Sequence, residues 1–210
     1  MKRLFIVGAG GFGREMLAMA EGSVGYGDCF KIAGFLDDRP DALDMFLGYP
    51  PVVGSVAGFK IGYDDVFITA IGDIGARRRC VEALEERGAR FVKLVHSTAV
   101  LGCNVTVGDG SFVGPYAFVS CDTNIGWHSC VFHGTSIGHD VRIGSFAHVY
   151  AQCSIGGGVE IGDGACVYPG AVVTPRRRIG KDAVVGAHST VFLDVPQGAR
   201  VIGSPAAPLV

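Results

Sequence analysis

Aliphatic residues recur at every sixth position through the second half of the chain. The run begins at Leu101 and continues to Val191, so that sixteen successive positions hold Leu, Val or Ile. Ten of them are followed directly by glycine, and the residue four places further on is usually small, as in Ser111, Ala117 and Thr135. A period of six fits neither the 3.6 residues of a helical turn nor the alternation of a hairpin strand. It predicts a coil of short strands joined by tight turns, with the aliphatic side chain inside and glycine allowing the turn.

This six-residue period is the signature of a parallel β-helix built from hexapeptide repeats. By resemblance to known hexapeptide proteins, the helix is left-handed with three repeats in each coil. Sixteen repeats would then make about five coils. Because the period never breaks, we expect no long loop between residues 101 and 195.

The first 96 residues follow a different pattern, in which apolar strands alternate with helical segments. Strands are predicted at the start of the chain and in residues 31–38, 64–73 and 90–95, with helices after the first glycine turn and in residues 74–88. This alternation favours a parallel sheet covered by helices, a half-sized Rossmann-like domain. We therefore expect two domains: an α/β Rossmann-like domain in residues 1–96 and an all-β left-handed β-helix with a C-terminal tail in residues 97–210.

A GxGxxG motif lies between the first predicted strand and its helix. Its glycines are Gly8, Gly10 and Gly13, and Asp37 lies near the end of the next strand, where a ribose-binding acid would stand. Such glycines let a backbone approach a phosphate, and a helix N-terminus favours any diphosphate. The motif therefore fits NAD, a nucleotide sugar, or tight packing without a ligand. About 95 residues is too few for a complete dinucleotide-binding fold, which disfavours NAD.

Composition excludes several classes of function. The formal charge of −2 and pI near 6.3 give no broad attraction to nucleic acid or to an anionic membrane. No apolar run approaches the roughly 20 residues that span a bilayer, and the start turns into glycines too soon for a signal peptide, so we expect a cytoplasmic protein. Seven cysteines without a CxxC pair indicate neither a disulfide framework nor a structural zinc site.

Two imidazoles and a carboxylate interrupt the repeat in SIGHDVRIGSFAHV. His139 lies two places after Ile137, a position that should point away from the bore, and Asp140 lies beside it. A histidine can act as a general base because its ordinary pKa, about 6.5, is close to neutral pH. A neighbouring carboxylate would orient the ring and favour its charged form in the transition state.

The joint pattern of the chain resembles the sugar O-/N-acyltransferase family. The resemblance rests on the glycine-rich start, the FLDD strand end, AIGD followed by Arg77, and an unbroken hexapeptide coil with HD and a later His148. The family includes sialic acid O-acetyltransferases and N-acetyltransferases of nucleotide-linked amino sugars. Membership implies a nucleotide sugar bound by the N-terminal domain, a homotrimer with active sites between subunits, and acetyl-CoA in the groove between neighbours. No metal is required.

The resemblance also implies roles for individual residues. His139 would take the proton from the attacking amine or hydroxyl, and Asp140 would raise its basicity. Acetyl-CoA would contact His148, Pro169 and Ala187. The nucleotide sugar would contact Gly11, Phe12, Gly13, Arg14, Asp37, Asp38, Gly72, Asp73 and Arg77.

The C-terminal segment departs from the family pattern. Its Gly203-Ser204-Pro205-Ala206 stretch matches a closing GxPA motif, but the basic residue that commonly follows is replaced by Ala207. The CoA phosphates would then need another partner, for which residues 176–178, three arginines, are one candidate and a solvated turn is the other reading. Arg177 occupies a repeat position that otherwise holds small residues, so we expect a local irregularity of the coil there.

The interpretation favoured by the sequence is transfer of the acetyl group of acetyl-CoA to an amine of a nucleotide-linked amino sugar. One alternative is an O-acetyltransferase acting on sialic acid or a related sugar hydroxyl. A second is a zinc enzyme of the γ-carbonic-anhydrase type that uses His128, His133 and His139. A third is a nucleotide-sugar binder without catalytic activity. The nucleotide and the sugar cannot be read from one sequence.

Overall fold

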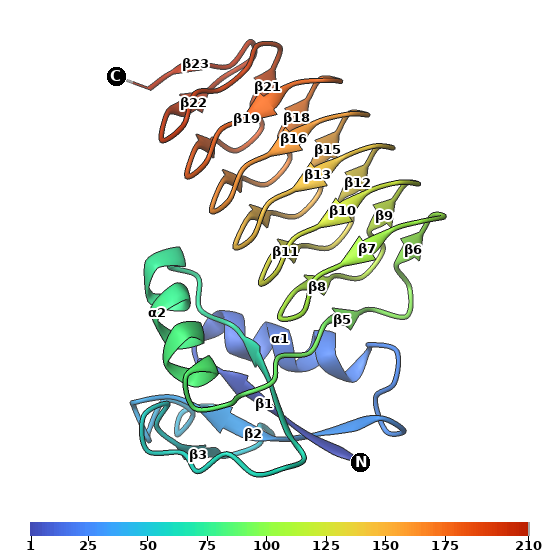
Figure 1. The fold of residues 1–210 in the computed structure, drawn as a ribbon. Coiled ribbons are helices and arrows are strands. Elements are labelled where there is room, and N and C mark those ends of the chain that lie inside the picture. Colours follow the sequence, from blue (N-terminus) through green and yellow to red (C-terminus); the bar gives the residue numbers. More distant parts are fainter. Residues whose placement is uncertain (210) are drawn as a thin grey trace. The chain divides into compact units, whose positions relative to one another are not determined.

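The structure, a computed structural model, describes residues 1–209 in two compact units. The N-terminal unit comprises Met1–Leu94, and the coil unit begins at Val95. The first is an α/β half-domain and the second a left-handed parallel β-helix, which confirms the predicted fold class (Figure 1).

The N-terminal unit is built on a parallel four-stranded sheet with the order β3-β2-β1-β4. Its strands are β1 (Lys2–Val7), β2 (Phe30–Leu36), β3 (Val52–Gly54) and β4 (Asp65–Thr69), and its helices are α1 (Gly11–Glu21) and α2 (Ile74–Glu85). The last four residues of β1 are buried, as expected for a central parallel strand, and every residue of β4 is buried although β4 is the last strand in the order. The short edge strand β3 was not predicted, because it follows two prolines and has no apolar run of its own.

The coil unit consists of very short strands that stack on three sides. They are β5 (Leu94–Val95), β6 (Val100–Leu101), β7 (Thr106–Val107), β8 (Phe112–Val113), β9 (Phe118–Val119), β10 (Asn124–Ile125), β11 (Cys130–Val131), β12 (Ser136–Ile137), β13 (Arg142–Ile143), β14 (His148–Val149), β15 (Ser154–Ile155), β16 (Glu160–Ile161), β17 (Cys166–Val167), β18 (Val172–Val173), β19 (Arg178–Ile179), β20 (Val184–Val185), β21 (Thr190–Val191), β22 (Arg200–Ile202) and β23 (Ala207–Pro208).

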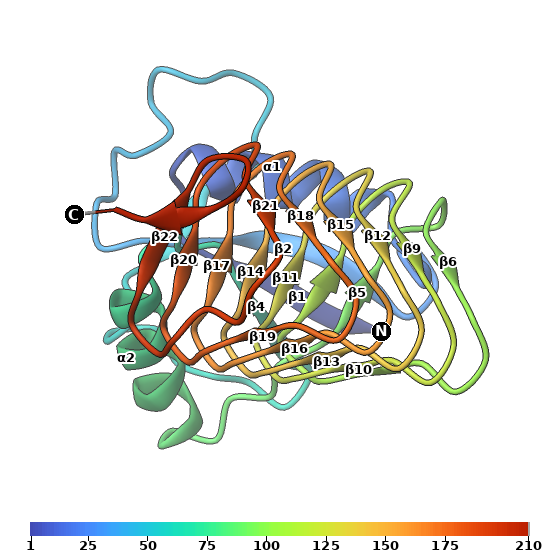
Figure 2. The same cartoon turned by 90° about the horizontal axis from the view of Figure 1, so that it is seen from above.

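Each side of the coil is one sheet, seen along its stack in Figure 2. The β6 side holds β6, β9, β12, β15, β18 and β21; the β7 side holds β7, β10, β13, β16 and β19; the β8 side holds β5, β8, β11, β14, β17, β20, β22 and β23. From β6 to β21, residues 18 apart pair in register, as Asn124 does with Arg142, and the last coil shortens this spacing to 16, as between Val184 and Arg200. Each corner joins two of the three sides and therefore lies opposite the remaining one.

The aliphatic residue of each repeat fills the bore. Fourteen of the sixteen, from Val113 to Val191, are buried, and Leu101 and Val107 in the first coil are partly buried. The small residues four places later, such as Ala147 and Ala165, complete this core. The period read from the sequence is therefore the period of the core, and burial of this apolar column stabilises the coil.

The glycines of the repeat have a different reason from the one predicted. Left-handed φ values recur every six residues from Asn104 to His188, on ten non-glycine residues and five glycines, and these positions make the corners. The ten glycines that directly follow an aliphatic residue are not among them. A Cβ at any of these ten would lie 2.3–2.9 Å from a heavy atom, mostly of the neighbouring coil. Close stacking of the coils, and not the turn, therefore requires glycine there.

The irregularity predicted at Arg177 is found only toward the following coil, where Ile179 pairs with Val195, 16 residues on, and the Arg178 N–H donates to Oδ1 of Asp194 at 3.0 Å. The Glu160 N–H donates to the Arg177 carbonyl at 3.0 Å, and the pairing of Glu160 with Arg178 keeps the common register. The side chain of Arg177 leaves the bore, and its Nη1 lies 3.5 Å from the Asp194 carboxylate.

After β22 the chain reverses into β23, the one antiparallel pairing among residues 1–209. None of the helices in these residues has the length and apolar character needed to cross a bilayer.

Candidate functional site

An exposed His-Asp pair occupies the corner between β12 and β13, which we call the His139 corner. The Nδ1 atom of His139 lies 2.6 Å from Oδ2 of Asp140, and the side chains are 65% and 64% exposed. Asp140 has a φ of 58°, a left-handed conformation that Asp tolerates better than most residues. The Asp140 N–H donates to the Cys121 carbonyl, and the His139 carbonyl accepts from the Gly158 N–H. The coils on both sides therefore fix the backbone of the pair.

The hydrogen bond between these side chains defines which ring nitrogen can accept a proton. An ionised carboxylate only accepts hydrogen bonds, so Nδ1 of His139 must carry the hydrogen in this contact. Nε2 is then the basic nitrogen. It lies over Gly157 of the next coil, where a Cβ would be only 2.7 Å from it. The absence of a side chain at Gly157 leaves the ring in this position.

His148 lies on the β8 side, opposite the His139 corner. Its side chain is fully buried, with Nδ1 3.2 Å from the Tyr150 hydroxyl and an edge contact to Phe132. The rings of Phe132, Tyr150 and Tyr168 stack on successive coils with centroids 4.9 and 5.0 Å apart. One chain therefore does not bring His139 and His148 together.

Pro169 and Ala187 occupy equivalent positions on successive coils, at the corner between the β8 and β6 sides. Both are exposed, and the His188 N–H donates to the Pro169 carbonyl. The structure brings these two residues together but places them on a different corner from His139. Their predicted contact with acetyl-CoA stays a prediction.

The histidines of the zinc alternative lie at three different corners. His128 is 5% exposed and stacks on Phe146, in space that Gly110 leaves open. His133 is exposed at the corner that also carries Pro169. Among residues 1–209 no group of three or more His, Cys, Asp or Glu is arranged to hold a metal ion.

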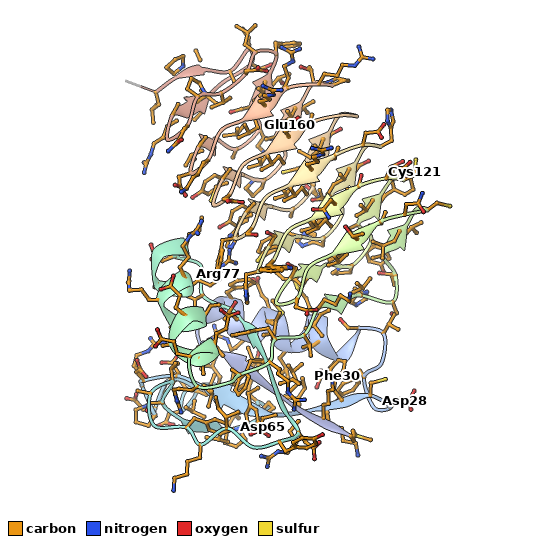
Figure 3. All side chains as sticks on the ribbon, viewed as in Figure 1. Asp28, Phe30, Asp65, Arg77, Cys121 and Glu160 are labelled. Carbon is orange, nitrogen blue, oxygen red and sulfur yellow. The ribbon has the colours of Figure 1, made fainter. Side chains whose placement is uncertain are left out.

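A shallow groove of about 490 Å³ follows the β7 side of the coil. Its rim carries Arg142, Glu160 and Arg178, and its floor is made of the glycines that close coil stacking requires. Nε of Arg178 is 3.2 Å from the Glu160 carboxylate, which offsets its charge (Glu160 is labelled in Figure 3). Of the three consecutive arginines, only Arg178 reaches this groove.

The N-terminal unit has a cavity of about 410 Å³ at the carboxyl ends of β1, β2 and β4. This edge of a parallel sheet is where ligands usually bind. Burial raises the pKa of the Cys80 thiol in its wall, and the Asp38 carboxylate adds to the effect. The cavity is lined by Val7, Gly8, Gly10, Leu36, Asp37, Asp38, Arg39, Val56, Ala70, Ile71 and Cys80.

The three glycines of the motif serve different purposes. Gly8 has a φ of 105°, and a Cβ there would lie 2.8 Å from the Ala70 carbonyl oxygen. A Cβ on Gly13 would lie 2.0 Å from the Gly8 carbonyl oxygen. Gly10 precedes α1, lines the cavity, and would meet no atom within 4 Å. The fold therefore explains Gly8 and Gly13 but not Gly10.

Asp37 is an anchor of the cavity wall. Its two oxygens accept from the Ala9 N–H at 2.8 Å and from the backbone N–H, Nε and Nη2 of Arg39, each at 3.0 Å. Burial alone would raise the pKa of Asp37, but the hydrogen bonds from Arg39 and Ala9 outweigh it and lower the pKa. These four bonds use the whole accepting capacity of a carboxylate. Asp38 uses only Oδ1, in a 3.3 Å bond from the Val56 N–H.

The other predicted nucleotide-sugar residues lie outside the cavity lining. Arg14 holds its guanidinium 3.7 Å from the Phe46 ring centroid. Asp73 caps α2 by accepting from the Ala76 N–H at 2.7 Å, and Arg77 of the same helix is fully buried (Figure 3). Gly11 and Gly72 are exposed. Phe12 is partly exposed and Gly13 is buried. Their roles toward a ligand stay predictions.

Sequence reasoning missed Arg39 and Cys80 as lining residues. Arg39 directly follows the two acids of FLDD, and a basic residue beside paired acids at a strand end was a usable signal. Cys80 lies on α2 three residues after Arg77, within one turn of the helix, and no signal in the sequence separated it from the other cysteines.

Comparisons with known proteins agree with this geometry. Residues 3–84 match the PglD N-terminal domain model, and residues 134–175 match the model for the bacterial transferase hexapeptide (six repeats). The first match lies in the N-terminal unit and the second in the coil unit, as the resemblance to the sugar O-/N-acyltransferase family implies. The resemblance inferred from the sequence is therefore confirmed. No curated protein sequence matches this chain.

Three solved structures are similar to this chain over its whole length. A histidine-to-asparagine mutant of perosamine N-acetyltransferase from Caulobacter crescentus, with CoA and GDP-perosamine, is 26% identical with a TM-score of 0.89 over 100% of this chain and 98% of that one. WeeI from Acinetobacter baumannii AYE is 26% identical with a TM-score of 0.86, and each chain is fully covered. The acetyltransferase domain of PglB from Neisseria gonorrhoeae FA1090 is also 26% identical, with a TM-score of 0.59 and full coverage of both.

Proposed function

We propose that the protein is an acetyl-CoA-dependent N-acetyltransferase that acts on the amine of a nucleotide-linked amino sugar, with His139 as the general base. The observation that carries this proposal is the exposed pair at the His139 corner, in which Nδ1 lies 2.6 Å from Asp140 and leaves Nε2 to accept a proton. The relative from Caulobacter crescentus holds both CoA and a nucleotide amino sugar and shares the fold of the whole chain.

The chemistry requires one proton transfer and no metal. The sugar amine attacks the thioester carbonyl carbon, so that a C–N bond forms and the C–S bond to CoA breaks. Nε2 of His139 takes the proton from the attacking nitrogen and returns it to the departing thiolate sulfur. Asp140 keeps the ring oriented and stabilises the imidazolium that forms in between.

The nucleotide would bind in the cavity of the N-terminal unit. A diphosphate fits beside Gly10, where α1 begins without a side-chain cap, the helix dipole favours an anion, and no side chain obstructs the approach. Arg39 lies at the same strand ends, with its guanidinium paired to the Asp37 carboxylate. Asp38 is the better acceptor for ribose hydroxyls, because the oxygens of Asp37 are already occupied. Binding energy from the nucleotide would then hold the amine for reaction by proximity.

The acetyl-CoA site would be shared between subunits of a homotrimer. His139 lies at one corner of the coil and His148, Pro169 and Ala187 lie on the opposite side or at another corner. A single chain cannot present His139 together with Pro169 and Ala187 to one acetyl group, whereas a His139 corner placed against the β8 side of a neighbour would bring them closer, with His148 buried in that side. The alternating charges of the β7 side, with Arg142 among them, would give the CoA phosphates a cationic partner.

The test is thiol release from acetyl-CoA against UDP-, dTDP- and GDP-linked amino sugars, CMP-sialic acid and free sialic acid. His139→Ala should lower kcat by about a hundredfold or more with one amino-sugar nucleotide, because the proton acceptor is removed. His133→Ala is the matched control: it has the same place in the repeat, is also exposed, and should retain full activity.

Three results would contradict the proposal: no turnover with any compound, turnover with sialic acid alone, or a His139→Ala enzyme as fast as the wild type. Sedimentation equilibrium of the same preparation tests the trimer separately. A monomer with full activity would overturn the shared site while leaving the role of His139 intact.

A further inference from the structure

The corner that carries His139 also carries two cysteines. Cys103, Cys121 and His139 are separated by 18 residues each and hold the same place in three successive coils. Figure 3 shows Cys121 at the outer edge of the coil. Cys103 is exposed and Cys121 is partly exposed, whereas Cys130 and Cys153 of the same unit are buried. Two thiols that solvent can reach are therefore stacked directly next to the proposed catalytic pair.

The backbone fixes the two cysteines at the spacing of neighbouring strands. Leu101 pairs with Val119, the Gly102 N–H donates to the Val119 carbonyl at 2.8 Å, and the Asp122 N–H donates to the Cys103 carbonyl at 2.9 Å. In-register parallel strands lie about 4.8 Å apart. A disulfide needs its two Cα atoms roughly 4.4–6.8 Å apart, so the register meets this requirement.

Side chains at the adjacent corner positions already bridge the same two coils. Nδ2 of Asn104 donates to Oδ1 of Asp122 at 2.9 Å. These residues directly follow Cys103 and Cys121, and their contact shows that side chains of the two coils meet here. Both lie at left-handed φ angles, 59° and 56°, so the two turns have the same conformation.

We propose that Cys103 and Cys121 form a thiol modification site that reacts with oxidants of the disulfide class and closes into a cross-coil disulfide. One thiolate attacks glutathione disulfide, forms a mixed disulfide and releases one glutathione thiol. The second thiolate attacks the mixed disulfide and releases another glutathione thiol. The two protein thiols lose two electrons and two protons, and glutathione disulfide gains both. An exposed disulfide of this kind is reduced readily, so the modification is reversible.

Closing this bond would act on the catalytic pair through the backbone. The Asp140 N–H donates to the Cys121 carbonyl at 3.1 Å, so a shift of Cys121 is passed to the partner of His139. A displacement of about 1 Å at a catalytic group can cost on the order of a hundredfold in rate. This consequence rests on the proposed function, whereas formation of the disulfide does not.

The experiment incubates the full-length protein with glutathione disulfide and measures mass and activity in parallel. Digestion on the N-terminal side of aspartate separates the two cysteines, because Asp109 lies between them. We expect the two fragments to stay joined without reductant and to separate with dithiothreitol. Thiol release should fall about tenfold on oxidation and return on reduction.

The variants distinguish the site from general thiol oxidation. Cys103→Ser should leave Cys121 with glutathione attached and no joined fragments, and Cys121→Ser should do the converse. Cys29→Ser removes an exposed thiol of the N-terminal unit and should change nothing. Unjoined Cys103 and Cys121 fragments in an oxidised wild type would overturn the site. Joined fragments with unchanged turnover would overturn only the effect on the catalytic pair, and a protein inactive before oxidation would count against the proposed function instead.

Discussion

Close packing requires most glycines in both units, and in each unit one glycine that packing of the backbone does not require is a candidate for function. In the coil a glycine follows most aliphatic residues because the next coil is too close for a Cβ. In the N-terminal unit Gly8 allows a close approach to Ala70 and Gly13 allows α1 to approach Gly8, but Gly10 faces an open cavity. Gly157 is the corresponding exception in the coil, because a Cβ there would meet the ring of His139 and not the backbone of the next coil. It has no left-handed φ, and the equivalent positions on the other coils hold Cys103, Cys121, His139 and Pro175.

The largest expected effect separates the glycines of the N-terminal motif. Gly13→Ala places a Cβ 2.0 Å from the Gly8 carbonyl oxygen, and backbone cannot move away cheaply. Its free energy of unfolding should fall by about 3 kcal/mol. Gly10→Ala meets no atom within 4 Å, so its stability should stay within about 0.5 kcal/mol of the wild type. Chemical denaturation measures both.

Gly10→Ala should instead weaken binding of the nucleotide sugar. The new methyl group lies at the cavity wall, where a diphosphate would approach the backbone, so KM should rise about tenfold with kcat retained. Unchanged KM in a folded Gly10→Ala enzyme would show that the open glycine does not contact the nucleotide. The contrast between the two glycines would then reflect packing alone.

The two units also differ in how much of their structure could be predicted from the sequence. The coil was predictable residue by residue, because one constraint, an aliphatic side chain in the bore, repeats sixteen times. His139 and Asp140 could be singled out because they are ionisable residues at repeat positions whose side chains the period predicts to point away from the bore. The reason for the repeat glycines could not be predicted from the sequence, because the distance between coils is a property of the assembled fold and not of any one repeat.

The N-terminal unit was less predictable because its polar residues have alternative roles that look identical in sequence. Asp73 and Arg77 follow a strand, as ligand-binding residues do, yet Asp73 caps α2 and Arg77 is buried. Asp37 is placed as a ribose acceptor would be, but it ties Ala9 to Arg39. Only the three-dimensional structure shows which carboxylates retain free lone pairs.

The next prediction tests whether the glycine exception of the coil serves the catalytic base. Gly157→Ala would place a methyl group 2.7 Å from Nε2 of His139. The imidazole is the far end of a flexible side chain, so the ring should move and the fold should not. We expect kcat to fall on the order of a hundredfold, because the base is displaced by about 1 Å, with the melting temperature unchanged.

A double mutant separates this explanation from a general defect at the corner. In a His139→Ala background, Gly157→Ala should cause no further loss, because the ring that it displaces is already absent. An additive loss would mean that Gly157 acts independently of His139, for example through its own backbone. Steady-state thiol release on the four proteins is sufficient.

The smallest expected effect compares two aspartates at the same place in adjacent coils. Asp140→Asn keeps a side-chain oxygen that can accept from Nδ1 of His139, and Asn tolerates the φ of 58° as well as Asp does. Only the negative charge is lost, so kcat should fall about tenfold through weaker stabilisation of the imidazolium. Asp122→Asn has the same geometry, with a φ of 56°, but accepts from Asn104 and has no histidine beside it. It should leave kcat unchanged. Equal losses in both variants would show that the charge of this corner acts at long range, and no loss in either would show that orientation of the ring, and not the charge of Asp140, supports the base.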